Sequence, residues 1–183
     1  SCPASDELGE SLMKRQAYLL VDGYNMIGAW PHLSRLQVVN IQEARDRLIA
    51  ELASYARMRQ VQVIVVFDAQ LVPGRATRLE QSGVQVVFTE ENETADSYIE
   101  RGVGAYIHPL NRVTVATSDM AEQWTIFQQG ALRMSAQELW LDLKLAKEEM
   151  TADVERYYSR RLRRHSPWSA RQLAKLDQLR KTL

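Results

Sequence analysis

The sequence predicts an α/β fold with three layers, in which a central parallel sheet is flanked by helices. Strand-like and helix-like segments alternate along the chain, and the strand-like segments are short and rich in Val, Ile, Leu or Phe. Alternation of this kind favours parallel strands joined by right-handed crossovers, with helices on both faces of the sheet. Hydrophobic residues make up 45% of the 183 residues, which is enough for a sizeable core.

The strand-like segments predict how the sheet is ordered. Five segments have the length and composition of strands: 17–22, 61–67, 84–88, 112–117 and, more weakly, 131–134. In sheets of this kind the first strand is commonly central, and the chain reverses direction between it and a later strand. We therefore expect the first and fourth strands to meet at this switch point, with the second strand beside the first.

Helical periodicity marks the connections between these strands. A repeat of three and four residues predicts an amphipathic helix over about 40–59, carried by Ile41, Ala44, Arg45, Leu48, Leu52 and Tyr55. Further helices are predicted over 94–107 and over 119–129, and Gly130 ends the second of them.

The C-terminal part is predicted to be helical. The pattern Ser135-Ala-Gln-Glu138 is a capping box, so a long helix should follow it. An apolar stripe continues along that helix at Leu139, Leu143, Ala146, Met150, Val154, Tyr157 and Leu162. Ser166-Pro167 interrupts it, and 169–181 has the pattern of a last, basic helix.

The zero net charge of the chain conceals an uneven distribution. From 155 to 183 there are nine Lys or Arg residues against two acids, which gives this segment +7 and leaves −7 for the first 154 residues. An acidic pocket beside a basic arm suits an enzyme that holds metal in one place and phosphates in another, although a solvated positive helix face explains the charge equally well. We divide the chain into a flexible leader (1–16), a folded domain (17–158) and a basic helical tail (159–183).

Four aspartates fall where an α/β sheet places its active site. Asp22, Asp68 and Asp119 follow apolar strand-like runs, and Asp96 lies at the start of the helix predicted from 94. Because ligands bind at the carboxyl ends of parallel strands, we expect these carboxylates to converge. Carboxylates gathered in one place repel one another unless a cation lies between them, so the pattern indicates a hard divalent ion such as Mg²⁺ or Mn²⁺.

Each aspartate also has an ordinary explanation. A strand-end aspartate often caps the next helix or shapes a turn, and Asp119 and Asp68 both fit such a role. The joint pattern favours a site, because three strands end in aspartate and Asp22 continues into Gly23-Tyr24-Asn25. There the glycine permits a tight backbone, and Asn25 supplies a neutral polar group beside the charge.

Four blocks of this sequence, in the right order, resemble those of a known family. They are LVDGYNMIGAW (20–30), VVFDA (65–69), ETADSYIE (93–100) and VATSD (115–119). The chain resembles the NYN-domain ribonucleases, specifically their YacP-like branch, which share the PIN-like nuclease fold. The resemblance runs from about Ala17 to about Tyr158.

The resemblance implies a metal-dependent endoribonuclease that cleaves single-stranded RNA, with Mg²⁺ or Mn²⁺ as its cofactor. It makes Asp22, Asp96 and Asp119 the central acids and metal ligands, supported by Asn25 and Asp68. Members of this branch have been connected with mRNA cleavage during translation, so mRNA and the ribosome are the candidate partners.

Several other residues are candidates for supporting roles. Glu93 could serve a second, weaker metal site, although an acid near a helix N-terminus is favourable without metal. Ser118 could position a phosphate or a carboxylate, or be a buried strand-end hydroxyl. Arg75 and Arg78 are candidates for a phosphate contact or for a solvated helix face. In the tail, the candidate RNA-binding residues are Arg160, Arg161, Arg163 and Arg164.

Two tryptophans next to prolines are less specific candidates. Trp30 precedes Pro31 and Trp168 follows Pro167, so both are predicted to lie in loops. An exposed tryptophan there could stack on a base, but anchoring of the loop is the favoured role.

Two other functional classes fit part of the pattern. A catalytically silent RNA- or ribosome-binding module would keep the fold and the tail, but it gains nothing from carboxylates that face phosphates. A phosphoacceptor or phosphohydrolase on a flavodoxin-like sheet would use a strand-end aspartate as nucleophile. That chemistry needs paired acids near the first strand and a lysine after a late one, and the sequence has neither.

Composition bounds the location of the protein. A single cysteine, Cys2, excludes an internal disulfide framework and a cysteine-based zinc site. No apolar stretch approaches the ~20 residues of a membrane span, and residues 1–16 lack the apolar core of a signal peptide. The expected location is cytoplasmic, or an organellar stroma if a transit peptide has been removed.

Overall fold

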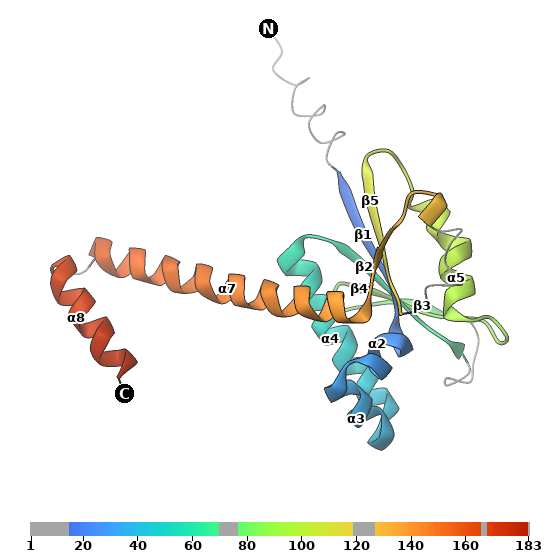
Figure 1. Cartoon of the computed structure of the whole chain (residues 1–183), viewed down its shortest axis with the longest axis horizontal. Coiled ribbons are helices and arrows are strands. Elements are labelled where there is room, and N and C mark those ends of the chain that lie inside the picture. The colour runs from blue at the N-terminus through green and yellow to red at the C-terminus, as the bar shows by residue number, and fades with distance from the viewer. Residues whose placement is uncertain (1–14, 70–76, 119–126, 166–167, 183) are drawn as a thin grey trace, which may run out of the picture. The chain divides into compact units, whose positions relative to one another are not determined.

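The structure is a computed structural model that describes residues 15–69, 77–118, 127–165 and 168–182. The chain divides into two compact units, Ser1–Leu143 and Lys144–Leu183. The first unit holds the sheet and the helices around it, and the second holds the C-terminal helical part from residue 144 onwards (Figure 1).

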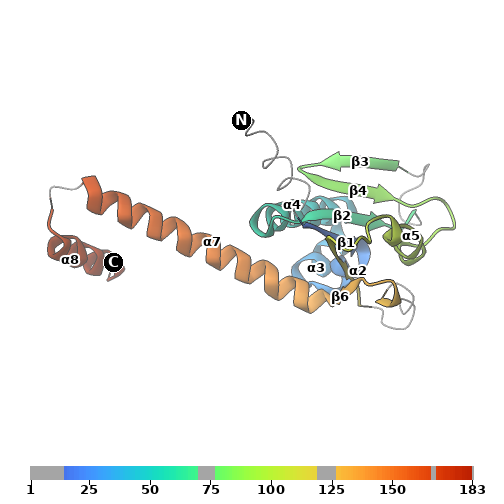
Figure 2. The same ribbon diagram turned by 90° about the horizontal axis from the view of Figure 1, so that it is seen from above.

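The first unit is built on a six-stranded sheet with the order β3-β4-β2-β1-β5-β6 (Figure 2). The strands are β1 (Gln16–Asp22), β2 (Gln62–Phe67), β3 (Thr77–Gln81), β4 (Val84–Phe88), β5 (Asn111–Ala116) and β6 (Leu132–Met134). Central β1 pairs in parallel with both β2 and β5, so the predicted switch point lies between β1 and β5. The three-layer α/β fold is confirmed, and all five predicted strands are present.

One strand departs from the sequence prediction. β3 is an antiparallel edge strand that pairs with β4, with Leu79 opposite Val86. The two strands are joined through Ser82 and Gly83, which both have positive φ (55° and 84°), as a tight hairpin turn requires. The interpretation of Arg78 as part of a solvated helix face was therefore wrong. Leu79 is the only apolar residue of β3, which is too little for a recognisable strand pattern.

The helices of the first unit connect the strands. Those on one side of the sheet are α2 (Gly23–Ala29), α3 (Pro31–Val39) and α4 (Ile41–Arg59), and α5 (Ala95–Gly102) with the 3₁₀ turn η2 (Val103–Ala105) lies on the other (Figure 1). The prediction of α4 is confirmed, and the Asn40 side chain caps it by accepting from the Glu43 N–H. The helix predicted over 94–107 ends earlier, at Gly102. Most of the segment 119–129 lies outside the described residues.

The core has two parts, one on each face of the sheet. On one face, α2, α3, α4 and the first turns of α7 (Ala136–His165) pack around Trp30, Leu48 and Phe67. On the other face, Ile99 of α5 and Val103 pack against the sheet. Trp30 is 1% exposed, and its indole N–H donates to the Ala136 carbonyl at 3.0 Å. The anchoring role of Trp30 is confirmed, and base stacking by this side chain is excluded by its burial.

The capping box that begins α7 is confirmed. The Glu138 N–H donates to Ser135 Oγ at 3.1 Å, and the Ser135 N–H donates to Glu138 Oε2 at 3.2 Å. The apolar stripe is buried only in its first part, at Leu139, Leu143 and Ala146. From Met150 onwards its members are exposed, so only the first part of the stripe belongs to the core.

In the second unit, the predicted basic helix is α8 (Ala170–Lys181). Ser169 begins it with a capping box in which Gln172 supplies the reciprocal side chain. No helix in the described part of the chain has the length and apolar character needed to cross a membrane.

Candidate active site

Asp22 lies at the carboxyl end of the central strand and at the start of a helix. It is the last residue of β1 and the N-cap of α2, where its carboxylate accepts from the Asn25 N–H at 3.4 Å. In register, Asp22 lies opposite Val66 of β2, and the preceding Val21 lies opposite Ala116 of β5. Asp22 therefore has the ordinary capping role and also occupies the switch point of the sheet.

Gly23 allows α2 to begin directly over the end of β2. A Cβ atom at this position would lie 2.3 Å from Cε1 of Phe67, whose ring is fully buried and part of the core. Such a contact is closer than atoms can approach without displacing the ring. The glycine is required here by the close approach of the helix to Phe67, which brings Asp22 to the end of β2.

Asp96 approaches from the other side of the sheet on α5. It lies in the first turn of this helix, whose N-cap is Thr94; the Thr94 hydroxyl accepts from the Ser97 N–H at 3.1 Å. The buried residues Ala95 and Ile99 fix the helix against the sheet. The helix start predicted at 94 is confirmed.

Thr89 joins the loop after β2 to the loop before α5. Its N–H donates to the Phe67 carbonyl at 3.0 Å, and its hydroxyl accepts from the Ala69 N–H at 2.9 Å. The same hydroxyl donates to the Glu93 carbonyl at 2.7 Å. These bonds position the segments that carry Asp68 and Asp96. Thr89 was not predicted as part of the site, although a threonine directly after an apolar strand is the available signal.

Asp22, Asp68 and Asp96 are close enough to affect one another electrostatically. The pKa of Asp22 is raised from 3.8 to about 7, first by burial and then by the negative charge of Asp96. The Asn25 N–H opposes this rise, whereas a hydrogen bond with the Asp96 carboxyl group and the charge of Asp68 add to it. Burial and like charge therefore favour the protonated form of Asp22 at pH values where an ordinary aspartate is ionised.

Asn25 connects the start of α2 to the end of β5. Its side-chain carbonyl accepts from both the N–H and the hydroxyl of Ser118, at 3.0 and 2.7 Å. Ser118 is exposed, so the interpretation of its side chain as a buried strand-end hydroxyl was wrong. The next residue in the chain, Asp119, lies outside the described residues.

Glu93, two residues before the start of α5, has a cationic partner. Its carboxylate is 2.8 Å from the Arg101 guanidinium, which also lies over the ring of Tyr98 at 5.0 Å. The charge of Glu93 is therefore balanced within the chain. Within residues 15–69, 77–118, 127–165 and 168–182, no three His, Cys, Asp or Glu side chains form a group that could hold a metal ion; Asp119 is not among these residues.

The candidate RNA-binding arginines lie in different parts of the molecule. Arg78, on β3, donates to the Tyr106 hydroxyl at 3.1 Å and also to Gln85. Arg75 lies outside the described residues. In the second unit, four exposed arginines occupy the last turns of α7: Arg160, Arg161, Arg163 and Arg164.

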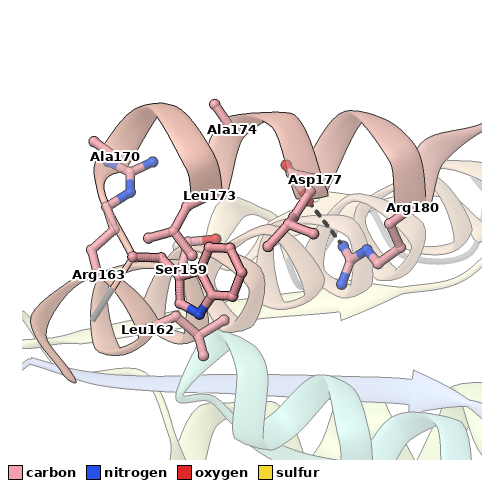
Figure 3. Close-up of a pocket in the computed structure, with 10 residues that line it drawn as sticks. Ser159, Leu162, Arg163, Ala170, Leu173, Ala174, Asp177 and Arg180 are labelled. Carbon is pink, nitrogen blue, oxygen red and sulfur yellow. Dashed lines mark ion pairs between the residues drawn. The ribbon is translucent and has the colours of Figure 1, made fainter. Parts of the chain in front are cut away.

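A groove within the second unit lies close to part of this basic segment. Leu162 of α7 and Leu173 of α8 give it apolar walls, and Arg163 lies at its side (Figure 3). Arg180 also lines it and forms an ion pair with Asp177 at 3.7 Å. Trp168, between the two helices, is 52% exposed.

The fold and this edge of the sheet narrow the class of protein. A mostly parallel sheet between helical layers, with Asp22 and Asp68 following neighbouring strands, is consistent with the PIN-like fold. A model of the YacP-like NYN domain matches residues 19–181. The chain belongs to this family, whose members are generally nucleases, and the match includes the basic segment beyond Tyr158.

Relatives in Bacillus subtilis agree with this assignment. The chain is 48% identical over 146 residues to the uncharacterized protein YacP of strain 168, covering 80% of this chain and 81% of YacP. One crystal structure of B. subtilis YacP, of a single-residue variant, superimposes with a TM-score of 0.68 at 44% identity, covering 79% of this chain and 85% of that one. A second YacP crystal structure superimposes with a TM-score of 0.67 at 43% identity. This match covers 90% of this chain and 91% of that one.

Proposed function

We propose that this protein is a metal-dependent endoribonuclease that cleaves single-stranded RNA at the carboxyl edge of its sheet. The observation that supports this most strongly is the shared environment of Asp22, Asp68 and Asp96, in which burial and like charge raise the pKa of Asp22 to about 7. Membership in a family of nucleases gives this acidic group its chemical context.

The donor set fits a hard divalent cation. Carboxylate oxygens are the ligands that Mg²⁺ and Mn²⁺ prefer, and Mg²⁺ needs few of them because it keeps several waters. Asp22 and Asp96 would hold the ion together with Asp119, and Asp68 would support them from the end of β2. A bound ion would activate a water molecule and neutralise charge on the phosphate.

The chain's own groups prepare this site for binding. Because Asp22 must lose its proton to act as a ligand, cation affinity should rise as the pH increases through about 7. Asn25 and Ser118 hold each other through two hydrogen bonds and add no further negative charge. This arrangement keeps neutral polar groups at the place where an anionic substrate must approach.

The charge of the tail supports RNA as the substrate class. Four exposed arginines at the end of α7 can neutralise phosphates along a single strand, whichever base sequence it carries. We propose mRNA as the substrate, with the ribosome as a partner during cleavage, in the cytoplasm or an organellar stroma.

Cleavage of a labelled single-stranded RNA with Mn²⁺ tests the proposal. Asp22→Asn should reduce the rate by at least about a hundredfold, the scale of losing one charge-stabilising group from an active site. The matched control is Asp46→Asn, which changes an exposed aspartate of α4 and should cleave at the parental rate. Binding without cleavage by the parental protein would instead favour the alternative, a catalytically silent RNA- or ribosome-binding module.

The role of the tail is tested by the salt dependence of RNA binding. Replacing Arg160, Arg161, Arg163 and Arg164 by glutamine should lower the slope of log affinity against log salt by up to about 3, because each phosphate contact to a single strand contributes about 0.7. The control replaces four exposed arginines of the first unit: Arg35, Arg47, Arg57 and Arg133. If the slope of log affinity against log salt were equal for the two quadruple variants, the tail arginines would form a solvated helix face and not an RNA-binding surface.

A further inference from the structure

Arg45 contacts the start of α2, two residues after Asp22, although it comes from another helix. On α4, its guanidinium donates to the hydroxyl of Tyr24 at 3.1 Å. Tyr24 is separated from Asp22 only by Gly23, so this bond reaches the first turn of α2. Both side chains are half-buried, which limits the number of positions that the guanidinium can occupy.

The other side of Tyr24 faces the end of β2. Its ring packs against Phe67 with the centroids 5.1 Å apart and the planes tilted by 58°. Phe67 is the last residue of β2 and directly precedes Asp68. The bonded pair Arg45 and Tyr24 therefore lies at the edge of the sheet where β2 ends and where Asp22 begins α2.

Arg45 has binding capacity that this contact does not use. A guanidinium carries five N–H donors in a planar fork. Among the described residues, the recorded bond to Tyr24 occupies a donor on Nη1 and no acid within 4.0 Å forms an ion pair with Arg45. The neighbouring Arg47 differs, because it lies 4.0 Å from Glu51 and its side chain is 65% exposed.

We propose that Arg45 binds a phosphate of the RNA at the acidic edge of the sheet, and that Tyr24 is the residue that positions it. This inference rests on the proposed ribonuclease function and adds to it the residue that holds the substrate. A phosphate that approaches several carboxylates is repelled by them, so a fixed cation beside the carboxylates is needed to bring it close. Arginine suits this role because its fork can bind two phosphate oxygens at once.

The test measures binding of a labelled single-stranded RNA to the full chain without divalent cations, across a range of salt concentrations. Arg45→Gln should weaken binding about tenfold at low salt, the scale of one charge-assisted hydrogen bond. It should also lower the slope of log affinity against log salt by about 0.7, the loss of one phosphate contact. Arg47→Gln, which removes the same charge from the same helix, should leave the slope at the parental value.

Two further variants separate positioning from charge. Tyr24→Phe keeps the ring on Phe67 and removes only the hydroxyl, so it should raise KM for cleavage while the salt slope remains parental. Arg45→Lys keeps the charge but loses the fork, so it should keep the slope and raise KM. Should Arg45→Gln fail to fold, Arg45→Lys and Tyr24→Phe carry the test, and parental KM in both would overturn the proposal.

The outcomes distinguish this inference from the function on which it rests. Equal slopes for Arg45→Gln and Arg47→Gln, in a protein that cleaves RNA, would overturn the phosphate contact and leave the ribonuclease in place. A lower slope for Arg45→Gln alone, in a protein that never cleaves RNA with Mn²⁺, would support the contact and remove the ribonuclease.

Discussion

Two aspartates at opposite ends of the sheet have opposite electrostatic environments. Asp22, at the carboxyl end of β1, has its pKa raised to about 7 by burial and by the negative charge of Asp96. Asp142, in the first turns of α7, lies beside the pocket formed by the start of β1 and the end of α4. Burial alone would raise the pKa of Asp142, but hydrogen bonds from Tyr55 and Arg59 and the charge of Arg59 outweigh burial and lower it.

The contacts of Asp142 explain this difference. The Tyr55 hydroxyl donates to its carboxylate at 2.5 Å, and Arg59 donates to both of its oxygens, the shorter bond being 2.7 Å. The negative charge of Asp142 is thus satisfied by groups of the chain. Asp22 instead has acids as its electrostatic neighbours, so a cation from solution would relieve its repulsion. A structural carboxylate and a candidate ligand are distinguished here by their neighbours as well as by the deeper burial of Asp22.

The largest effect on stability is expected for Asp22→Asn, and it should depend on pH. Because the native pKa is raised, the native state binds a proton that the unfolded state releases between pH 3.8 and about 7, so the ionised side chain destabilises the fold as pH rises through this range. At about 1.4 kcal/mol for each pKa unit, the ceiling is about 4 kcal/mol. Partial exposure of the side chain lowers this ceiling. We therefore expect the unfolding free energy of the variant to exceed that of the parent by about 2–3 kcal/mol at pH 8 and by almost nothing at pH 4.

Denaturant unfolding in the presence of a chelator measures this gain. Adding Mn²⁺ at pH 8 should stabilise the parental protein, because the ion binds only the ionised native site. The difference in unfolding free energy between the variant and the parent should therefore become smaller. A difference that is the same at pH 4 and pH 8 would contradict the environment assigned to Asp22.

Asp142→Asn should act in the opposite direction. At pH 7 it should cost about 1–3 kcal/mol of unfolding free energy, because it removes the charge from a partly exposed, hydrogen-bonded pair. Since the native pKa of Asp142 is lowered, its stabilisation is present above the unfolded pKa and is lost as the pH falls through the native value. Denaturant melts at pH 7 and pH 3 measure the difference, and RNA cleavage by the folded variant should stay parental. A variant more stable than the parent at pH 7 would refute the comparison.

Tyr55→Phe should have the smallest effect, about 1 kcal/mol, the usual net value of one hydrogen bond. The ring stays in the core and only the bond to Asp142 is lost, while Arg59 still holds the carboxylate. Thermal or denaturant unfolding near pH 7 gives the value. If Tyr55→Phe lowered the unfolding free energy by the same amount in an Asp142→Asn background, the hydroxyl would stabilise the fold through a partner other than Asp142.

Much of the fold could be predicted because it depends on local patterns. The apolar strands and the three- and four-residue repeat of α4 identified their elements with correct boundaries to about one residue. The helices α2 and α3 were missed because they are too short for a clear repeat, and β3 was missed because it is an edge strand with one apolar residue. Such elements are fixed mainly by their tertiary contacts.

The candidate site could be predicted only in part. The strand-end positions of Asp22 and Asp68 and the helix start at Asp96 were visible in the sequence. The bonds that hold these segments were not, because Asn25 and Ser118 are 93 residues apart and Thr89 acts through backbone groups. Nothing local marks Asp142 as the partner of Tyr55, 87 residues away. Pairings of this kind follow from the order of the strands, which the sequence only suggests.

The central claim is that the acids at the carboxyl edge of the sheet bind a divalent cation. The most direct measurement is a crystal structure of the protein soaked with Mn²⁺ at pH 8, where Asp22 is ionised, with the ion located by its anomalous scattering. We expect an anomalous peak bonded to carboxylate oxygens of Asp22 and Asp96. A saturated crystal without a peak at this edge, with Asp22 and Asp96 side chains ordered, would contradict it.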